Sequence, residues 1–341
     1  NKILINTPSK ENKLIDSFGR KIDYLRISVT DRCDLRCTYC MAEDVTFLPR
    51  QEVLSIEEII KLTDIFNELG VKKFRLTGGE PLVRKNVISI IEHLHNLKIQ
   101  GRISEHTLTT NGTNLSKYAS ILKKNGVERI NVSLDSLDPE SFKRITKWGD
   151  LNKVLNGIEV AKQEGIKIKI NTVLTYNFND KEIFGILDWC KKNQFDISLI
   201  EIMPIGDIGE KRFNQFLSMK KFEEDLVNKL NLNPSKHRTN GPSRYYEYSN
   251  HNSKIGIISA ISHNFCDTCN RVRLTCTGKL YMCLGQNDFV DLKFALRNQT
   301  KNDIIAQIEY AMSIKPKAHN FEIQKDNFGG YVNRYMNETG G

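Results

Sequence analysis

Six short segments of alternating apolar and polar residues recur along the first two-thirds of the chain, each followed by a stretch with helical periodicity. The expected strands cover residues 24–30, 72–77, 105–111, 129–135, 166–173 and 197–204. Ser55 and Glu58 predict a capping box, and Gly70, Gly126 and Gly165 follow amphipathic runs as expected helix ends. Six β-α units in series predict a parallel sheet with right-handed crossovers. Because a closed barrel of this kind has eight units, we expect an α/β fold in the form of an open, partial TIM-like barrel.

One face of each expected strand is polar. The residues on these faces are Arg26, Ser28 and Thr30; Lys73, Arg75 and Thr77; Thr107, Thr109 and Asn111; Asn131, Ser133 and Asp135; and Lys167, Lys169 and Asn171. Parallel strands are normally covered on both faces. We therefore expect the apolar faces to pack against helices and the polar faces to line a hydrated interior, suited to a large anionic ligand.

The composition narrows the classes of protein that need to be considered. The net charge of +9 favours anionic partners, but the lysines are scattered over the expected helices, so nucleic-acid binding is not predicted. The sequence contains no apolar run long enough to span a membrane, and the stretch NKILINTPSKENKLI lacks the apolar centre of a secretory signal. We expect a soluble, cytoplasmic protein without a membrane partner.

Six of the eight cysteines fall into two local groups, which in a chain of 341 residues predicts metal or redox chemistry rather than a disulfide framework. Cys33, Cys37 and Cys40 follow the first strand, at the rim where such folds bind ligands. A structural zinc site needs four protein ligands, and a thioredoxin-like pair would leave Cys33 unused. An iron-sulfur cluster held by three cysteines leaves one iron open to a cofactor or substrate.

The second group, Cys266, Cys269 and Cys283, lies in the segment CDTCNRVRLTCTGKLYMCL. Thr277-Gly278 between two alternating runs predicts a hairpin. Arg271 and Arg273 would then project from one face beside the cysteines, and guanidinium groups match the oxygens of a triphosphate. A zinc ribbon completed by Cys276 is the alternative.

The motifs together resemble known families. The C-x-x-x-C-x-x-C spacing, Tyr39 before its last cysteine and the Gly-Gly-Glu-Pro at 78–81 resemble the radical S-adenosylmethionine superfamily. The segments FGRKIDYLRISVTDRCDLRCTYCM, FRLTGGEPLVR, TTNGT, RINVSLDSLD and CDTCNRVRLTCTGKLYMCL, with a terminal Gly340-Gly341, are similar to the GTP 3′,8-cyclase family. The similarity runs from about residue 16 to the end of the chain. It implies the first reaction of molybdenum cofactor biosynthesis, the conversion of GTP to 3′,8-cyclo-7,8-dihydro-GTP.

The resemblance also implies which residues bind which group. Two 4Fe-4S clusters would be held by Cys33, Cys37 and Cys40 and by Cys266, Cys269 and Cys283. The S-adenosylmethionine site would be shaped by Tyr39, Gly79, Ser133 and Met203, and GTP would contact Arg26, Arg75, Thr109, Lys169, Arg271, Val272 and Arg273. No catalytic acid or base is implied. The family uses the terminal Gly340-Gly341 inside its active site.

The same resemblance predicts the partners. A reductant protein would supply electrons, cyclic pyranopterin monophosphate synthase would receive the product, and a homodimer is compatible with the family. We expect two regions, a radical S-adenosylmethionine core over residues 1–235 and a C-terminal cluster and substrate region over 236–341.

Three positions depart from the family pattern. Cys276 replaces a small residue without a thiol, Ser198 stands where relatives commonly carry Arg, and Ala42 replaces Pro. Two alternatives remain at this point: a radical enzyme with auxiliary clusters that modifies a peptide, and a zinc-dependent binding module without catalysis.

Overall fold

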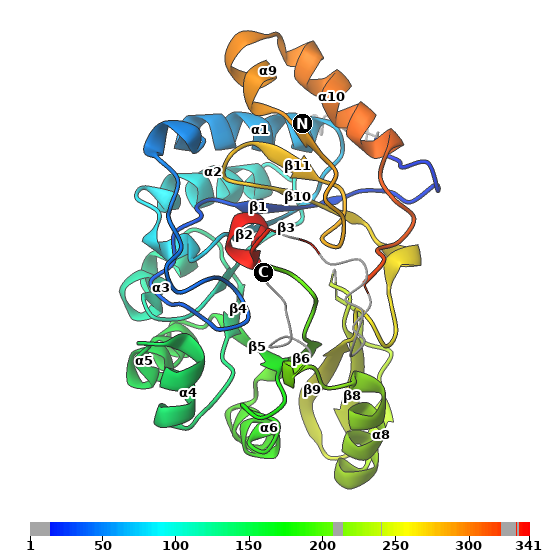
Figure 1. Cartoon of the computed structure of the whole chain (residues 1–341). Helices are drawn as coiled ribbons and strands as arrows, with labels where there is room; N and C mark the ends of the chain where they lie inside the picture. The colour runs from blue at the N-terminus through cyan, green and yellow to red at the C-terminus, as the bar shows by residue number, and fades with distance from the viewer. Residues whose placement is uncertain (1–13, 207–213, 240, 322–331, 333) are drawn as a thin grey trace, which may run out of the picture.

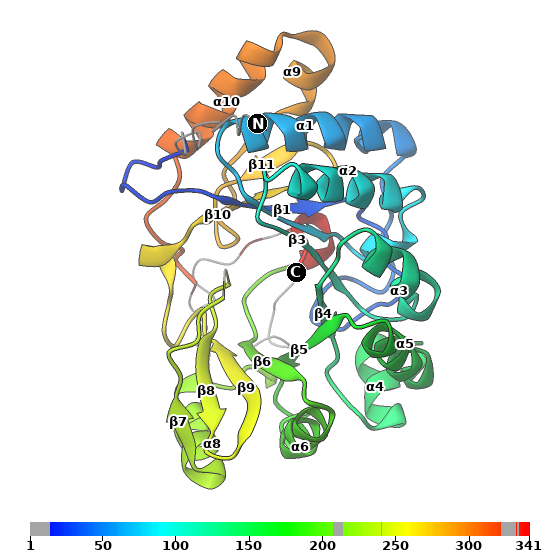
Figure 2. The same cartoon turned by 180° about the vertical axis from the view of Figure 1, so that it is seen from behind.

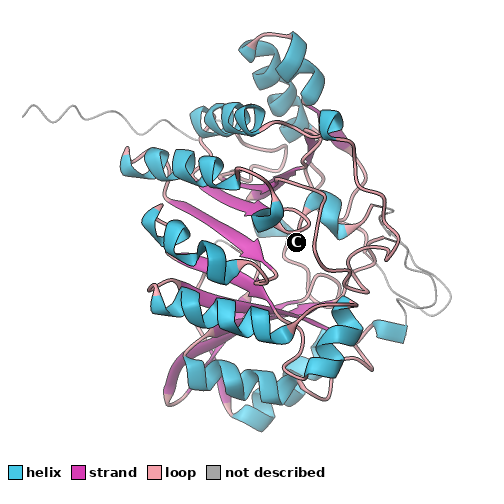
Figure 3. Cartoon of the chain, turned by 90° about the vertical axis from the view of Figure 1, so that its left-hand side faces the viewer, coloured by secondary structure: helices cyan, strands magenta, loops and turns pink. Residues whose placement is uncertain are grey.

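The computed structural model describes residues 14–206, 214–239, 241–321, 332 and 334–341. The first thirteen residues, where no secretory signal is expected, lie outside this part of the chain. The described residues form an α/β fold around one sheet of twelve strands, in the order β12-β11-β10-β1-β2-β3-β4-β5-β6-β9-β8-β7. Helices lie on the outside of this curved sheet (Figures 1, 2 and 3).

The centre of the sheet consists of the six predicted strands, parallel and in chain order, so the predicted open barrel is confirmed. Register places polar residues side by side, with Arg26 opposite Arg75 and Asn131 opposite both Thr109 and Lys169. The strands are β1 (Tyr24–Ser28), β2 (Lys73–Thr77), β3 (Glu105–Thr110), β4 (Arg129–Ser133), β5 (Lys167–Leu174) and β6 (Asp196–Glu201).

The connecting helices begin and end at the capping residues and glycines predicted from the sequence. Ser55 and Glu58 form the reciprocal capping box of α1. Gly70, Gly126 and Gly165 follow helix ends with positive φ values of 105°, 71° and 75°, a conformation that glycine adopts without steric cost. The helices are α1 (Ile56–Glu68), α2 (Val87–Ile99), α3 (Leu115–Lys124), α4 (Pro139–Thr146), α5 (Leu151–Gln163), α6 (Ile183–Asn193) and α8 (Met219–Leu230), and the short 3-10 helices are η1 (Arg50–Glu52), η2 (Pro81–Val83) and η3 (Cys266–Thr268).

The C-terminal region extends the sheet at both edges. At one edge, β10 (Arg271–Leu274) pairs in parallel with β1 and continues through β11 (Lys279–Tyr281) to β12 (Phe289–Asp291). At the other, β9 (His251–Ile258) pairs in parallel with β6 and with the antiparallel β8 (Arg244–Tyr248), which pairs with β7 (Leu232–Pro234). The hairpin predicted at Thr277-Gly278 is confirmed. The boundary near residue 235 separates β7 from β8 within this sheet, and the division into two regions stays a prediction.

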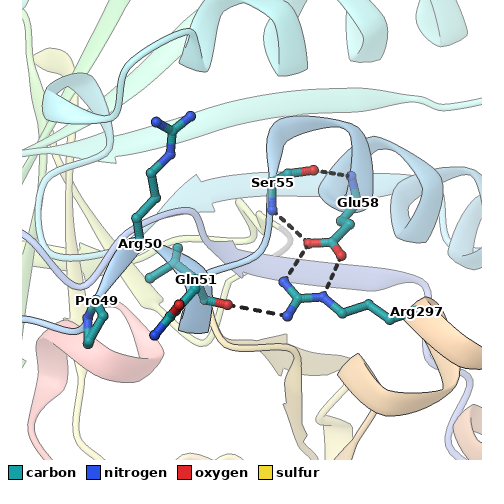
Figure 4. Close-up of a pocket in the computed structure, with 7 residues that line it drawn as sticks. Pro49, Arg50, Gln51, Ser55, Glu58 and Arg297 are labelled. Carbon is teal, nitrogen blue, oxygen red and sulfur yellow. Dashed lines mark hydrogen bonds and ion pairs between the residues drawn. The ribbon is translucent and has the colours of Figure 1, made fainter.

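Two helices near the end of the chain attach to α1, the first at its start and the second, through Lys301 and Glu68, at its end. These are α9 (Lys293–Asn298) and α10 (Lys301–Ser313). Arg297 of α9 donates to the Glu58 carboxylate from Nε (2.7 Å) and Nη2 (3.1 Å), and to the Gln51 carbonyl from Nη1 (3.2 Å). Figure 4 shows the shallow hollow around these contacts. The hollow lies away from both cysteine groups, and among the described residues that line it the cations are Arg50 and the ion-paired Arg297.

The apolar faces of the strands pack as predicted. Ile27, Leu76, Leu108, Val132 and Ile170, all essentially inaccessible to solvent, belong to one hydrophobic core between the sheet and its helices. Among the described residues no helix is long and apolar enough to cross a membrane.

Candidate active site

A cavity of about 290 Å³ lies inside the curve of the sheet, where the polar strand faces meet. Both cysteine groups border this cavity, although Cys40 and Cys266 are more than two hundred residues apart in sequence. Its lining includes the polar residues Arg26, Arg75, Thr77, Thr109, Asn111, Asn131, Ser133, Lys169 and Asn171, together with Cys33, Cys37, Cys40, Cys266, Cys269 and Cys283. A polar, cationic interior is therefore present, as strand alternation predicted. Lys73 and Lys167, also assigned to it, do not line the cavity, because Lys73 pairs with Asp23 (3.0 Å) and Lys167 is exposed.

The first cysteine loop is held by backbone contacts with two neighbours. The amides of Arg36 and Thr38 donate to the Thr146 and Ile145 carbonyls at the end of α4 (3.1 and 3.0 Å). The Leu35 amide and the Asn111 side chain donate to the Cys33 sulfur (3.4 and 3.7 Å). These contacts turn the thiols of the group toward the cavity.

The charge state of these thiols indicates the kind of group that fits between them. Burial raises the pKa of both Cys33 and Cys37, and negative charge on Cys40 raises each of them further. These thiols therefore stay protonated unless a bound cation offsets the negative charge of their thiolates. Among the described residues, no three His, Cys, Asp or Glu side chains converge on the position of one metal ion. The donor set and its arrangement around open space fit a larger iron-sulfur cluster.

Gly78 and Gly79 pack the loop after β2 directly onto the cysteine loop. The Gly79 and Glu80 amides donate to the Thr30 and Arg32 carbonyls, both at 2.8 Å. A Cβ at Gly78 would lie 2.5 Å from the Thr30 carbonyl oxygen, and one at Gly79 would overlap the Arg32 backbone. Only glycine permits this approach, which explains physically why the motif carries two.

Glu80, the third residue of the motif, is fully buried. It accepts from the Thr110 hydroxyl and the Asn111 amide (both 2.7 Å) and from the Leu82 amide (3.0 Å). Burial raises its pKa to about 7, and the hydrogen bonds oppose that shift. Glu80 thus ties the ends of β2 and β3 together beside the cysteines.

The other residues expected around S-adenosylmethionine also border the cavity. The Tyr39 hydroxyl donates to Asp135 Oδ2 (2.5 Å), and the opposite Asp135 oxygen accepts from the Val173 amide (2.8 Å). Burial raises the Asp135 pKa to about 6. Ser133 and Met203 line the cavity from the ends of β4 and β6, in the same lining as Tyr39 and Gly79.

Strand register assembles the second cysteine group. Arg273 pairs with Tyr281 in the antiparallel β10–β11 ladder, so Cys283 stands near Arg271 and Cys269 at the open end of the hairpin. Cys266 joins them from η3. Lys315, only 2% exposed, directs its ammonium group to the Cys269 sulfur (3.6 Å) and the Met282 carbonyl (2.5 Å). Although burial opposes it, the charges of Lys315 and Arg271 lower the pKa of Cys269.

Cys276 lies at the opposite end of the same hairpin. It is in the turn, five residues beyond Arg271 along the strand, which corresponds to about 16 Å at the usual rise of an extended chain. Its carbonyl accepts from the Leu54 amide (2.7 Å). Burial and the charge of Asp31 raise its pKa to about 12, and Cys276 is absent from the cavity lining. The hairpin therefore holds Cys276 apart from the trio that a zinc ribbon would need it to complete.

The cations expected to contact GTP surround the cavity. Arg75 donates from Nε to the Tyr24 hydroxyl (2.5 Å) and from Nη1 to Thr109 Oγ1 (3.1 Å). Lys169 donates to the Tyr245 hydroxyl (2.5 Å), and burial lowers the pKa of its ammonium group. Arg271 lies over the Phe265 ring. Val272 borders the cavity, but its side chain belongs to the hydrophobic core.

The C-terminal segment enters this cavity. Gly341 accepts from Arg26 and from the Thr77 hydroxyl (3.2 Å), and Gly340 accepts from Arg273 Nη1 (2.6 Å). Figures 1 and 2 both show the chain end inside the curve of the sheet. The Met336 amide, at the start of α11 (Met336–Thr339), donates to the Cys40 carbonyl (3.1 Å). The expected place of Gly340-Gly341 inside the site is thus what the structure shows.

Sequence reasoning missed several residues that support the site. Tyr24 and Tyr245 orient Arg75 and Lys169, and Arg334 donates to the carbonyls of Leu284 (2.5 Å) and Gln286 (2.7 Å) just beyond Cys283. Only Tyr24 shares the strand parity of the predicted lining. Lys315 and Arg334 are over thirty residues from the cysteines in sequence, and no local pattern marks them. Ser198, buried, bonds to the Ser243 hydroxyl (2.8 Å) and lies behind the cavity wall.

Comparison with known proteins assigns the family. Residues 27–190 match the Radical SAM superfamily, and residues 195–321 match the family described as Molybdenum Cofactor Synthesis C. A GTP 3′,8-cyclase of Brucella ovis is 49% identical over 334 residues, covering 98% of this chain and 97% of the relative. The chain belongs to the GTP 3′,8-cyclase family. A second cyclase, from Sinorhizobium medicae, is 50% identical over 329 residues, 96% of this chain and 94% of the relative.

Two solved structures with bound S-adenosylmethionine share the fold of this cyclase family member. Streptococcus suis SuiB bound to S-adenosylmethionine superposes with a TM-score of 0.57 at 15% identity, covering 83% of this chain and 63% of SuiB. The anSMEcpe enzyme with AdoMet and a bound peptide gives a TM-score of 0.53 at 18% identity, covering 85% and 84% of the two chains. At these identities the likeness establishes the fold alone. This chain is a radical S-adenosylmethionine enzyme by family, with one 4Fe-4S cluster and S-adenosylmethionine as its family cofactors.

Proposed function

We infer that this protein converts GTP to 3′,8-cyclo-7,8-dihydro-GTP, the first step of molybdenum cofactor biosynthesis. Beside the family assignment, one observation carries this inference: two groups of three cysteines and a set of buried cations face a single cavity. A radical source at one end and a nucleotide held at the other would be within one enclosed site. The alternative of a peptide-modifying radical enzyme is not favoured, because the relatives that match over nearly the whole chain are cyclases.

Cys33, Cys37 and Cys40 would hold the first cluster, with S-adenosylmethionine bound beside it against Tyr39, Gly79, Ser133 and Met203. When bound and reduced, these cofactors supply a carbon-centred radical able to remove a hydrogen atom from a ribose carbon. The chain's own contribution is to orient and enclose. Asp135 fixes the Tyr39 ring beside the loop, and Gly78 and Gly79 hold the neighbouring loop in backbone contact.

A second 4Fe-4S cluster would be held by Cys266, Cys269 and Cys283 and would meet the guanine base. Three observations support this assignment. The three thiols border the cavity, Lys315 places a positive charge against Cys269, and Cys276 lies at the far end of the hairpin. A cluster with three protein ligands keeps one iron open for a substrate atom.

The triphosphate and ribose would contact Arg26, Arg75, Thr109, Lys169, Arg271 and Arg273, with Val272 contributing at the cavity edge. Arg75 and Arg273 are buried and Arg26 is partly buried, and desolvation and mutual repulsion lower the pKa of Arg26 to about 10 and that of Arg273 well below its usual value. A bound polyanion would neutralise these arginines and remove the repulsion between them. Holding GTP at both ends would align C3′ with C8 of the same nucleotide, which lowers the entropic cost of ring closure.

Gly340 and Gly341 would act with the substrate rather than as a passive tail. They accept hydrogen bonds from Arg26 and Arg273, the side chains assigned to GTP. The reductant protein, the receiving synthase and a homodimer belong to this proposal as partners and carry no separate structural observation.

The test is a metal analysis followed by turnover, on wild type and Cys276→Ser purified without oxygen. About eight irons per chain in both, as two 4Fe-4S clusters require, with GTP consumed and 5′-deoxyadenosine released, is the expected result. About four irons with one zinc that the variant loses would contradict the second cluster. Two full clusters with no consumption of GTP would contradict the reaction itself.

A further inference from the structure

We propose that Lys315 is a positioning residue for the second cysteine group, which acts through Cys269 by raising the reduction potential of the cluster held there. It does so by placing a positive charge and a hydrogen bond on one sulfur ligand. The inference rests on the proposed function, because it assumes that Cys266, Cys269 and Cys283 hold a 4Fe-4S cluster.

Lys315 carries a buried charge that no carboxylate balances. It is 2% exposed, and its ammonium group donates to the Met282 carbonyl (2.5 Å) and to the Cys269 sulfur (3.6 Å). Within the part of the chain that the structure describes, Lys315 forms no ion pair. A lysine is almost never fully buried unless an opposite charge lies close to it, because removing its charge from water is costly. The thiolates of a bound cluster supply that opposite charge.

The charge of such a cluster determines what the lysine does to it. Three thiolates carry more negative charge than an oxidised 4Fe-4S core carries positive charge, so the assembled group is anionic. An electron accepted by the cluster adds to this negative charge. A fixed cation at the sulfur therefore stabilises the reduced cluster more than the oxidised one. Net charge and hydrogen bonds to the sulfurs are among the quantities that set the potential of iron-sulfur clusters.

Lys315 reaches the cysteines without lining the cavity itself. Cys269 and Cys283 both border the cavity, whereas Lys315 is not among the residues that line it. Met282, whose carbonyl accepts from the lysine, directly precedes Cys283. One ammonium group thus contacts the backbone beside one cysteine and the sulfur of another. Because it does not face the cavity, Lys315 affects the substrate through the cluster and not by contact with GTP.

Arg20 fixes the segment that carries Lys315 to the same cysteine group. It donates from Nη1 and Nη2 to the carbonyls of the two residues that follow Lys315, both at 2.7 Å, and from Nη1 to the Cys266 carbonyl (2.7 Å). Its Nε is paired with the buried Asp16 carboxylate (2.6 Å). The backbone beyond Lys315 is therefore held against the first cysteine of the group, which keeps the ammonium group at the sulfur of the next.

The first cysteine group offers a contrast. A carboxylate oxygen of Asp34 lies 3.9 Å from the Cys33 sulfur, and the Leu35 amide and the Asn111 side chain that donate to this sulfur are both neutral. The described contacts of Cys33 thus include a negative charge where those of Cys269 include a positive one. We expect the effect of Lys315 on the second cluster alone.

The experiment measures the reduction potential of the second cluster by redox titration with dithionite, followed by electron paramagnetic resonance. Cys33→Ser, Cys37→Ser and Cys40→Ser are introduced together in the whole chain, so that the signal comes from the second group. On this background, Lys315→Met removes the charge, Lys315→Arg keeps it, and Lys317→Met changes an exposed lysine of the same segment. In the titrated step the cluster takes up one electron from the reductant, and no bond forms.

We expect Lys315→Met to shift the equilibrium at least ~10-fold toward the oxidised cluster, the scale of losing a hydrogen bond to a charged group. For one electron this is a fall of ~59 mV in the reduction potential. Lys315→Arg should keep a potential close to that of the unchanged lysine, because it restores the charge. Lys317→Met should have no effect.

An unchanged potential in Lys315→Met with full iron content would overturn the proposal. Loss of the second cluster from both Lys315→Met and Lys315→Arg would also overturn it, because the lysine would then be needed for its shape. Loss from Lys315→Met with retention in Lys315→Arg would support a requirement for charge. Failure of the proposed function is distinguishable, because wild type would then bind zinc at the second group or leave GTP unconsumed. An unchanged potential beside normal turnover would refute the role of Lys315 alone.

Discussion

Among single residues, Arg26 and Arg273 show that the cavity carries a concentrated positive charge in the absence of substrate. Arg273 is buried and Arg26 is partly buried, both near Arg271, and desolvation together with this crowding lowers the pKa of each guanidinium group. In the structure their partners are backbone carbonyls of the last two glycines. The site therefore holds more positive charge than its surroundings neutralise, and an anionic ligand would stabilise it.

Arg273→Ala should weaken GTP binding about 10- to 100-fold, because hydrogen bonds to a charged group contribute roughly 1.5–3 kcal/mol. Release of 5′-deoxyadenosine without cyclisation should continue, since the substitution changes none of the residues assigned to the first cluster or to S-adenosylmethionine. Equilibrium binding of GTP and quantitation of both products measure this. Arg297→Ala, which removes a surface arginine paired with Glu58, is the control. Undiminished GTP affinity in Arg273→Ala would refute the assignment to the triphosphate.

His106 makes a prediction about pH far from the cysteines. It is 3% exposed, Nε2 contacts the Asn125 carbonyl (2.8 Å), and burial lowers its pKa. The folded protein then binds this proton less readily than the unfolded chain does, so the free energy of unfolding falls as the pH drops below about 6.5.

His106→Gln should flatten this acid loss of stability between about pH 6.5 and 5, the range below the unperturbed histidine pKa. The melting temperature of the cluster-loaded protein across this range measures it. His263→Gln, at an exposed histidine, should keep the wild-type slope. If the two variants and wild type lose stability in parallel, the burial of His106 does not contribute to the pH dependence.

At the scale of elements, the C-terminal segment joins parts of the site that lie far apart in sequence. Arg334 anchors it beyond Cys283, Met336 donates to Cys40, and the final glycines reach Arg273 and Arg26. The segment therefore contacts both cysteine loops and the cations between them. Its sequence alone, ending in two glycines, is indistinguishable from a mobile terminus.

Deleting Gly340 and Gly341 should abolish cyclisation of GTP and leave the iron content unchanged. Two single substitutions distinguish the effect of an added side chain from the effect of a shorter C-terminal tail. Gly340 has φ +76° and a Cβ there would overlap Thr77, so Gly340→Ala should be impaired. A Cβ at Gly341 would meet only Met336 Cε at 3.7 Å, so Gly341→Ala should retain activity. Full turnover by the deletion variant would show that the tail has no part in the reaction.

The packing around two glycines inside helices predicts opposite effects of alanine substitution on stability. A Cβ on Gly157 of α5 would lie 2.7 Å from the Gly112 carbonyl oxygen and 3.0 Å from Leu115 Cβ, where α5 crosses the start of α3. Gly157→Ala should lower the free energy of unfolding by about 1–3 kcal/mol through overpacking.

Gly185 of α6 is the matched control, because nothing lies within 4 Å of a Cβ there. Gly185→Ala should raise stability by up to about 1 kcal/mol, the difference in helix propensity. Thermal unfolding of both variants tests the pair. A stabilising Gly157→Ala would mean that α3 and α5 are not in the contact that the structure gives them.

At the scale of the whole molecule, much of the fold and part of the site could be predicted from the sequence. Three features depend only on residues close together in sequence and could therefore be predicted: the strand periodicity, the capping box at Ser55 and the hairpin at Thr277-Gly278. Alternation also assigned Arg75 and Lys169 correctly to the interior. These predictions succeeded because side-chain direction along a strand depends only on parity.

Other features depend on how distant segments meet. The attachment of β9 and β10 to opposite edges of the sheet, which brings the two cysteine groups to one cavity, has no signature within either segment. Lys315 reaches Cys269 from the end of α10, and Tyr245 reaches Lys169 from β8. The spacing of the cysteines could not decide whether Cys276 completes a zinc site with the second group. That depended on the register of the β10–β11 hairpin.

We propose that GTP lies in this cavity with its C3′ hydrogen toward the first cysteine group and its base toward the second. Turnover of GTP carrying deuterium at C3′, with S-adenosylmethionine and reductant, tests this directly by mass spectrometry of the released 5′-deoxyadenosine. We expect one deuterium in 5′-deoxyadenosine and none at C3′ of the cyclised product. Unlabelled 5′-deoxyadenosine, formed while GTP is consumed, would contradict it.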